Sequence, residues 1–196
     1  MIFLTSVNLD NIDGGEKHRT ISLLNAFSRL SDKVYLIAPG YNENLIDRDN
    51  IIFYKHSFTF TRRDVLLKKY FIKDQYLADL LEELTTINAD KLALLDFEFH
   101  GHYISKFKKA SYAVIYSTHN YHSNLTYQQI KFSTGISKVF RLYNYLAQLL
   151  HERVYFKHAD LLLVCSKQDQ GAQAKLNSNI QIVNNVLWTK EQKNFK

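Results

Sequence analysis

Short apolar runs alternate with longer amphipathic stretches along the whole chain. Most of these runs are continuous and rich in aliphatic and β-branched residues, rather than alternating with polar positions. Continuous runs of this length are typical of parallel strands that are covered on both faces. The predicted strands are residues 3–7, 34–38, 51–54, 92–95, 113–116, 161–164 and 180–183.

The stretches between the predicted strands carry apolar residues at helical spacing. The apolar face of the first predicted helix consists of Leu23, Leu24, Phe27 and Leu30. Two longer helices are predicted within residues 64–84 and 137–158. A short helix is predicted after Ser166, because Ser166 and Asp169 have the spacing of a capping box. This alternation predicts an α/β fold: a Rossmann-like, doubly wound, mainly parallel sheet flanked by helices.

The composition favours one globular domain. The 196 residues are 46% hydrophobic, which is enough for a core and excludes a disordered chain. The 25 basic and 19 acidic residues give a net charge of +6. That charge favours nucleic acid, an anionic membrane face or a phosphorylated small molecule as partner, unless it is only a basic surface. The single cysteine, Cys165, favours a reducing compartment and is expected to pack inside a strand rather than act as a nucleophile.

Two adjacent glycines follow the first predicted strand. Gly14 and Gly15 are expected to open the first helix, where a backbone without Cβ atoms lets a ligand come close. The N–H groups of a helix start favour an anion such as a diphosphate. Arg19 lies one turn further on and is expected to reach that anion or the opposite wall of a cleft. The alternative is a tight turn at the glycines and a solvated Arg19, since neither a dinucleotide fingerprint nor a P-loop is present.

Polar side chains also follow the fourth and fifth predicted strands. They are Asp96, Glu98 and His100 after the fourth strand, and His119 and Asn120 after the fifth. Ligands of open α/β sheets bind beyond the carboxyl ends of the strands, so these residues are expected to face one cleft. There His119 would hydrogen-bond a substrate hydroxyl or stabilise developing charge; the alternative is a histidine bonded to a neighbouring carbonyl. Metal binding by His100 and His102 is disfavoured, since no thiolate and no H-E-x-x-H motif accompany them.

Basic and aromatic residues gather between residues 55 and 73, where Arg62, Arg63, Lys68 and Lys69 lie among phenylalanines and a tyrosine. Cations beside exposed aromatic rings suit an anionic membrane surface or a nucleic-acid backbone. The alternative is a solvated helix whose aromatic residues face the core. No nucleic-acid-binding motif is present, so a membrane face is the functional prediction for the four basic residues, beside the solvated helix.

Four stretches together resemble the N-terminal domain of retaining GT-B-fold glycosyltransferases (glycosyltransferase family 4-like). Gly14, Gly15 and Arg19 resemble the family's glycine-rich loop, and residues 117–120 (Ser-Thr-His-Asn) resemble its strand-end His-Asn. Residues 152–169 are similar to its pattern of a helix Glu, then Ala-Asp, a strand, Ser and a helix. Residues 180–186 resemble the strand that leads into its Asn-Gly-Val.

This resemblance spans essentially the whole chain, with two departures. Asn185 stands where the family usually has Gly, and residues 31–34 (Ser-Asp-Lys-Val) replace its Gly-His, which leaves the subfamily and the sugar open. The resemblance implies that residues 1–188 are the acceptor-binding domain and that residues 189–196 are a tail or begin an interdomain connection. It further implies that the C-terminal donor domain is absent from this chain and is supplied in cis or in trans.

The resemblance also implies the roles of the candidate residues. His119 would be catalytic, Gly14 and Gly15 would approach the donor diphosphate, and Arg19, Glu98, His100 and Asn120 would contact the acceptor. The implied reaction moves a hexose from a nucleotide-sugar to a cell-envelope, capsule or lipid-linked glycan acceptor, without a metal or other cofactor.

The implied location is the cytoplasm, either free or peripheral on the inner membrane face, and the chain alone is expected to be inactive. One alternative is a non-catalytic partner or scaffold subunit of a two-chain glycosyltransferase. Nucleic-acid binding, motivated only by charge and aromatic residues, is the other. An open reading frame that continues past Lys196 into a second α/β domain would favour the enzyme.

Overall fold

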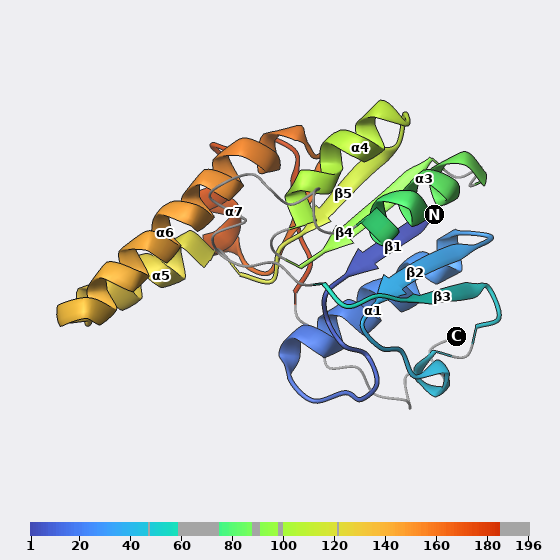
Figure 1. The fold of residues 1–196 in the computed structure, drawn as a ribbon, viewed down its shortest axis with the longest axis horizontal. Coiled ribbons are helices and arrows are strands. Elements are labelled where there is room, and N and C mark those ends of the chain that lie inside the picture. The colour runs from blue at the N-terminus through green and yellow to red at the C-terminus, as the bar shows by residue number, and fades with distance from the viewer. Residues whose placement is uncertain (47, 59–74, 88–90, 98–99, 121, 185–196) are drawn as a thin grey trace.

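The computed structural model describes residues 1–46, 48–58, 75–87, 91–97, 100–120 and 122–184. In this part of the chain, seven parallel strands form one sheet in the order β3-β2-β1-β4-β5-β6-β7 (Figure 1). The strands are β1 (Ile2–Thr5), β2 (Val34–Ala38), β3 (Ile51–Lys55), β4 (Leu92–Asp96), β5 (Ala113–Ser117), β6 (Leu161–Val164) and β7 (Ile180–Ile182). The α/β, doubly wound sheet expected from the sequence is therefore confirmed.

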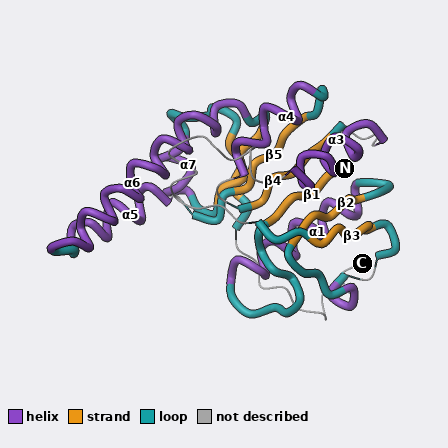
Figure 2. Tube along the Cα trace, in the orientation of Figure 1, coloured by secondary structure: helices purple, strands orange, loops and turns teal. Residues whose placement is uncertain are grey.

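Helices connect the strands and cover the sheet (Figures 1 and 2). The α-helices are α1 (Gly15–Leu30), α3 (Gln75–Ile87), α4 (Ile104–Lys109), α5 (His122–Lys131), α6 (Gly135–Tyr155) and α7 (Lys167–Gln173). Short 3-10 helices are η1 (Glu43–Leu45), η3 (His100–Tyr103) and η4 (Phe156–His158). None of the helices in the described ranges is both long and apolar enough to cross a bilayer.

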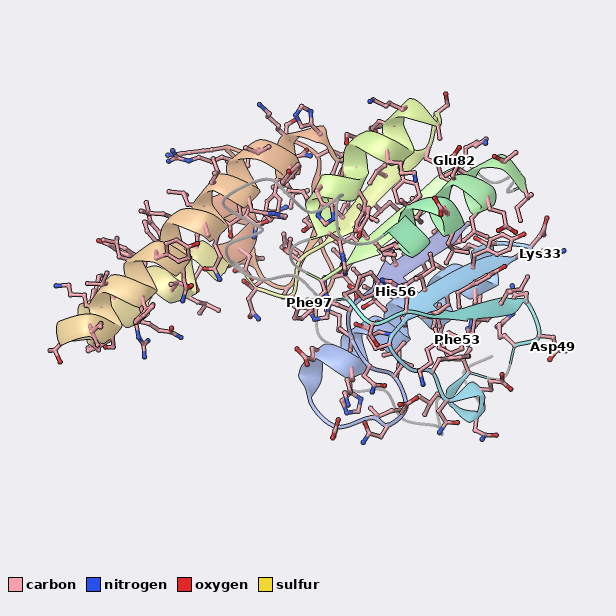
Figure 3. The ribbon with its side chains drawn as sticks, in the orientation of Figure 1. Lys33, Asp49, Phe53, His56, Glu82 and Phe97 are labelled. Atoms are coloured by element: carbon pink, nitrogen blue, oxygen red, sulfur yellow. The ribbon has the colours of Figure 1, made fainter. Side chains whose placement is uncertain are left out.

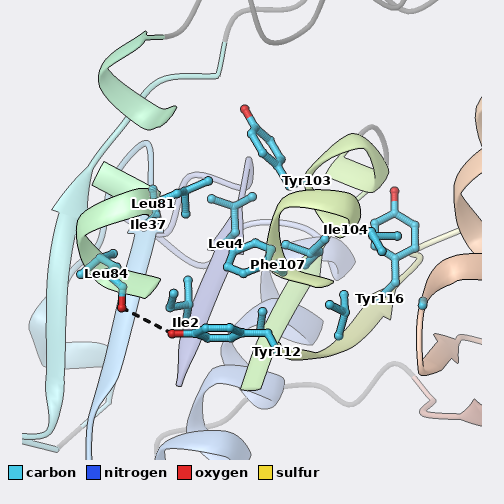
Figure 4. Packing of buried hydrophobic residues seen from close by; sticks show 14 of the residues in the cluster. Ile2, Leu4, Ile37, Leu81, Leu84, Tyr103, Ile104, Phe107, Tyr112 and Tyr116 are labelled. Atoms are coloured by element: carbon cyan, nitrogen blue, oxygen red, sulfur yellow. Dashed lines mark hydrogen bonds between the residues drawn. The ribbon is translucent and has the colours of Figure 1, made fainter. Parts of the chain in front are cut away.

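The core lies in two layers, one on each face of the sheet. On one face, Ile2 and Leu4 of β1 pack with leucines of α3 and with Phe107 of α4. Figure 4 shows this layer, in which the Tyr112 hydroxyl donates to the carbonyl oxygen of Leu84 at 3.4 Å. On the other face, Phe3 packs with Ile21 and Leu24 of α1. Successive strand residues thus point into opposite layers, which explains why the strand sequences are continuously apolar.

The predicted strands are all present, and the differences are at their ends. Strand β1 ends at Thr5, because the Thr5 hydroxyl accepts a hydrogen bond from the Val7 amide and turns the chain out of the sheet. The capping box after Ser166 is confirmed, with the Ser166 hydroxyl accepting from the Asp169 amide at 3.1 Å. The short helices α4 and α5 were not predicted.

Two expectations about the helices need correction. Leu30 does not belong to the buried face of α1, since 81% of its surface is exposed at the last residue of the helix. The helix predicted from residue 137 begins at Gly135 and gives way to η4 after Tyr155. Of the helix predicted at 64–84, residues 64–74 lie outside the described ranges, as does the predicted tail at 189–196.

Helices α5 and α6 form a hairpin that extends away from the sheet (Figures 1 and 2). The two helices pack on each other through a hydrogen bond of 2.6 Å from the Thr126 hydroxyl to the Gln148 amide oxygen. At its base, the buried carboxylate of Glu152 accepts hydrogen bonds from the amide and the hydroxyl of Ser123. These two donors lie in the first turn of α5, so Glu152 caps that helix from α6.

Candidate functional site

The candidate site lies where the strand order of the sheet reverses. Strand β1 is followed in sequence by β2 on one side, whereas β4 pairs with it on the other side. Thr5 at the end of β1 is paired with Asp96 at the end of β4, and Asp96 is paired with Ser117 at the end of β5. Ligands of doubly wound sheets bind at this reversal, beyond the carboxyl ends of the strands.

Asp96 organises the side chains at this point. It is fully buried, and its Oδ2 accepts hydrogen bonds from the hydroxyls of Thr20 (2.6 Å) and Thr5 (3.2 Å). Its Oδ1 lies 3.0 Å from Nε2 of His119. Burial by itself would raise the pKa of the Asp96 carboxyl, but the attraction and hydrogen bond of His119, with the hydroxyls of Thr20 and Ser117, lower it to about 2. Asp96 is therefore a carboxylate at neutral pH.

This carboxylate fixes the orientation of His119. An ionised carboxylate only accepts hydrogen bonds, so Nε2 of His119 must carry the hydrogen that Asp96 receives. The imidazole is 5% exposed and packs against the ring of Phe97, with 5.3 Å between centroids. The bond to Asp96 meets the expectation that His119 is held in a fixed position. Any direct contact of this ring with a substrate would involve Nδ1 or a ring carbon.

Backbone strain accompanies the end of β4. Phe97 has a φ of 84°, which a residue with a bulky side chain rarely adopts. Its amide donates to the carbonyl oxygen of Ser117 at 3.1 Å, which joins the ends of β4 and β5. In Figure 3, Phe97 and His56 mark the carboxyl-terminal edge of the sheet. The strained backbone thus positions the Phe97 ring beside His119.

Cys165 lies at this site and not within a strand, so its predicted place in the core is wrong. Strand β6 ends at Val164, and Cys165 is only partly buried. Its thiol donates to the carbonyl oxygen of His119, with an Sγ–O distance of 2.9 Å. Cys165 therefore supports the backbone of His119 from the neighbouring strand end.

The start of α1 faces open space. Gly14 precedes the helix with a φ of 98°, which favours glycine, and no side chain caps the helix there. A Cβ atom added at Gly14 or Gly15 would meet nothing within 4 Å. The two glycines therefore leave the first N–H groups of the helix open to approach. A negatively charged group is stabilised at such a position.

Arg19 is buried one turn along the same helix. It is 1% exposed, and its Nη1 donates to the carbonyl oxygen of Val183, just after β7. Its Nε and Nη2 have no hydrogen-bond partner among the described residues. Buried guanidinium nitrogens nearly always find an acceptor, because leaving them unpaired is costly. Arg19 directly precedes Thr20, so two successive residues of α1 bind the segment after β7 and Asp96 respectively.

A group of buried histidines lies next to the site, on η3 and α6. His100, His102 and His151 are each at most 4% exposed, and His151 Nε2 is 3.3 Å from the Tyr116 hydroxyl. Burial lowers the pKa of His151 to about 3 and that of His100 well below its usual value. His100 packs edge-on against Phe58. Among the described residues, no three His, Cys, Asp or Glu side chains are grouped so as to hold a metal ion.

Of the remaining predicted site residues, Asn120 and His100 lie in the described ranges. Asn120 follows His119 and is exposed, and His100 is buried within η3. Glu98 and the predicted membrane-facing residues Arg62, Arg63, Lys68 and Lys69 lie outside the described ranges. The hydrogen bonds that Asp96 forms with Thr5 and Thr20 were not predicted. The sequence signal for Asp96 was its position directly after a predicted strand. The sequence does not reveal which other strand end lies beside it.

No family model and no curated protein sequence matches this chain. Its structure is similar to a solved sucrose-phosphate synthase chain from Thermosynechococcus elongatus, with a TM-score of 0.51 and 8% sequence identity. The alignment covers 97% of this chain and 90% of the synthase chain. The two chains share a fold. The Rossmann-like sheet expected for one half of a GT-B glycosyltransferase is thus confirmed, and at this identity the likeness to the synthase concerns the fold alone.

Proposed function

We propose that this chain is the acceptor-binding half of a retaining glycosyltransferase. The enzyme would move a hexose from a nucleotide-sugar to a cell-envelope, capsule or lipid-linked glycan acceptor. A C-terminal donor domain, in the same or a separate polypeptide, would complete the active site. The fold and the sequence motifs support this proposal, because the motif residues Gly14, Gly15, Arg19 and His119 lie at the side of the sheet where the strand order reverses.

One observation carries this proposal: the His119 imidazole is held by an ionised, buried Asp96 at the reversal of strand order. A histidine fixed in this way loses little freedom when a substrate binds, so it can orient a hydroxyl or a sugar ring accurately. Placed beside the reacting atoms, His119 would stabilise negative charge that develops on the reacting oxygens.

The donor diphosphate would lie between the two domains, facing the start of α1. The open N–H groups at Gly14 and Gly15 would offset its negative charge, as would the two Arg19 nitrogens that have no partner in the described part of the chain. In the reaction, the acceptor oxygen bonds to the anomeric carbon while the bond to the diphosphate oxygen breaks. The departing phosphate would take the proton of the acceptor hydroxyl, so His119 would orient and stabilise without acting as the base. These groups allow the proposed reaction to proceed without a metal.

The test is sugar transfer with the donor domain restored, either fused to this chain or added as a separate polypeptide. His119→Ala is expected to lower kcat by about 100- to 1000-fold, the usual effect of losing one transition-state contact. His158→Ala is the matched control, because His158 is exposed on η4. His119→Gln, which keeps a donor near Asp96, separates loss of folding from loss of chemistry. An unchanged transfer rate in a folded His119→Ala variant would contradict the proposal for His119.

A further inference from the structure

The α5–α6 hairpin presents an unusual concentration of apolar side chains to solvent. Among the described residues, all but three of the large hydrophobic side chains that are strongly exposed lie between Leu125 and Leu150. The most exposed are at the tip and on the first turns of α6: Phe132 (87%), Ile136 (75%), Val139 (66%) and Phe140 (63%). Scattered exposed apolar residues are ordinary, but a group gathered on one projecting element indicates an interaction surface.

The hairpin is built as a defined element and is not a loose insertion. Three contacts join its two helices: the Thr126–Gln148 hydrogen bond, a 2.9 Å bond from Arg141 Nη1 to the Gln129 amide oxygen, and the tilted contact between the rings of Tyr127 and Tyr145. Its base is fixed to the sheet by the buried His151 of α6, whose Nε2 lies 3.3 Å from the hydroxyl of Tyr116 on β5. The hairpin therefore holds the exposed apolar tip away from the body of the molecule (Figures 1 and 2).

The charge of the hairpin identifies the chemistry of its partner. Lys131 lies beside Phe132, Lys138 lies two residues after Ile136, and Arg141 follows Phe140. Residues 122–151 contain no Asp or Glu, and Glu152 is buried at the base. The tip thus combines exposed aromatic and aliphatic side chains with cations and no exposed acid. This combination is typical of elements that insert apolar side chains between anionic lipid headgroups.

We propose that the α5–α6 hairpin docks the protein on an anionic lipid bilayer. Phe132 and Ile136 would enter the boundary between headgroups and acyl chains, and Lys131 and Lys138 would pair with lipid phosphates. A second copy of this chain suits the surface poorly. Two hairpins packed together would bring their cations close without any acidic residue to offset them, because residues 122–151 contain no Asp or Glu. This surface is separate from residues 62–69, and the proposal does not depend on transferase activity.

Vesicle binding by the purified chain tests the proposal. Binding is expected to vesicles of mixed phosphatidylglycerol and phosphatidylcholine, and to be much weaker with phosphatidylcholine alone. Binding should also fall with added salt, since the screening length drops from about 10 Å at 0.1 M to about 3 Å at 1 M. The double variant Phe132→Ser/Ile136→Ser is expected to lose at least about tenfold in binding to the mixed vesicles, because two apolar side chains no longer enter the bilayer.

Matched variants assign the effect to the hairpin. Leu30→Ser replaces an equally exposed apolar residue on α1 and should bind as the unchanged chain does. Lys131→Gln/Lys138→Gln should reduce binding, whereas Lys109→Gln/Lys157→Gln, at exposed positions elsewhere, should reduce it much less. In addition, the fluorescence of Phe132→Trp should shift to the blue with the mixed vesicles, and that of Leu30→Trp should not.

Three results would overturn the proposal. They are the absence of binding to the mixed vesicles, equal binding by the Phe132→Ser/Ile136→Ser variant, and a dimer in light scattering that this variant converts to a monomer. Equal binding would place the lipid contact elsewhere on the chain, and the dimer would make a second copy the partner of the hairpin. The replaced residues are exposed, so their variants are expected to keep the thermal unfolding temperature of the unchanged chain.

Discussion

The carboxylate of Asp96 lies at the end of β4 without any exposed surface, and side chains from three other segments donate to it. Thr5 comes from β1, Thr20 from α1, and His119 from the segment after β5. A buried charge is tolerated only when such donors replace its lost hydration. The same bonds that keep Asp96 ionised also fix which nitrogen of His119 carries the hydrogen. Stability and the geometry of the site therefore depend on one residue.

Asp96→Asn should lower the free energy of unfolding at pH 7 by about 2 kcal/mol, because the Asp96 pKa falls from 3.8 to about 2 on folding. A carboxyl whose pKa is lowered by folding contributes its full stabilisation of the folded state at pH values above its unfolded pKa. That contribution disappears as the pH falls toward 2. The difference in unfolding free energy between the variant and the unchanged chain should therefore become smaller between pH 4 and pH 2. Urea unfolding at several pH values measures it.

Asp32→Asn is the control for this experiment, since Asp32 is exposed before β2. It should leave the unfolding free energy within about 0.5 kcal/mol of the original at pH 7. A variant at Asp96 that is as stable as this control would show that the carboxylate is not held by its neighbours as described.

At the scale of elements, the close packing of η3 on α6 depends on one glycine. A Cβ atom added to Gly101 would lie 2.6 Å from Cβ of Tyr155 and 2.9 Å from Nε2 of His151. Both distances are shorter than non-bonded atoms accept, so η3 can approach α6 only without a side chain at this position. The contact fixes the base of the hairpin against the segment that follows β4.

Gly101→Ala should therefore destabilise the protein by about 1–3 kcal/mol, the usual cost of forcing an extra carbon into a packed interior. Gly171→Ala is the matched comparison within α7, where an added Cβ would meet nothing within 4 Å. That variant should stabilise the protein by about 0.5–1 kcal/mol, because alanine loses less freedom in a helix than glycine does. Thermal or urea unfolding compares them. A neutral Gly101→Ala would indicate that η3 and α6 separate readily.

Helix α6 also shows how much of an element the sequence can predict. The spacing of apolar residues in the region 137–158 predicts a helix, and a helix is present there. The same spacing did not reveal that its outer half has no sheet beneath it, as the exposed Phe140 and Leu146 show. Periodicity reports the shape of a segment, whereas burial depends on which segments lie beside it.

The candidate site, too, could be predicted from the sequence only in part. His119 could be proposed from its position directly after a strand, because strand ends carry ligand contacts in this class of sheet. Gly14 and Gly15 could be proposed as the glycines that open the first helix. The pairing of Asp96 with His119 could not be derived, since it joins residues 23 positions apart through the order of the strands. The burial of Arg19 could not be derived either, because it depends on the carbonyl of Val183, which is distant in sequence.

At the scale of the whole molecule, the carboxyl edge of the sheet brings the start of α1 together with the chain that leaves β7. Arg19 links the two through its bond to Val183, and two of its nitrogens have no partner among the described residues. An anion that binds at Gly14 and Gly15 would satisfy these donors and would stabilise the folded state by mass action.

Inorganic pyrophosphate should therefore raise the thermal unfolding temperature of this chain. At ten times its dissociation constant the stabilisation is about 1.4 kcal/mol, or roughly 3–6 °C for a domain of this size.

Arg19→Met should lose most of that shift, although its own unfolding temperature will be lower because the bond to Val183 is also lost. Arg29→Met, at an exposed position in the last turn of the same helix, should retain the shift. A control with sodium chloride at the same ionic strength distinguishes the binding of pyrophosphate from the screening of charges by salt. A shift of equal size in Arg19→Met would show that pyrophosphate binds elsewhere, and the diphosphate contact proposed for Arg19 would then be wrong.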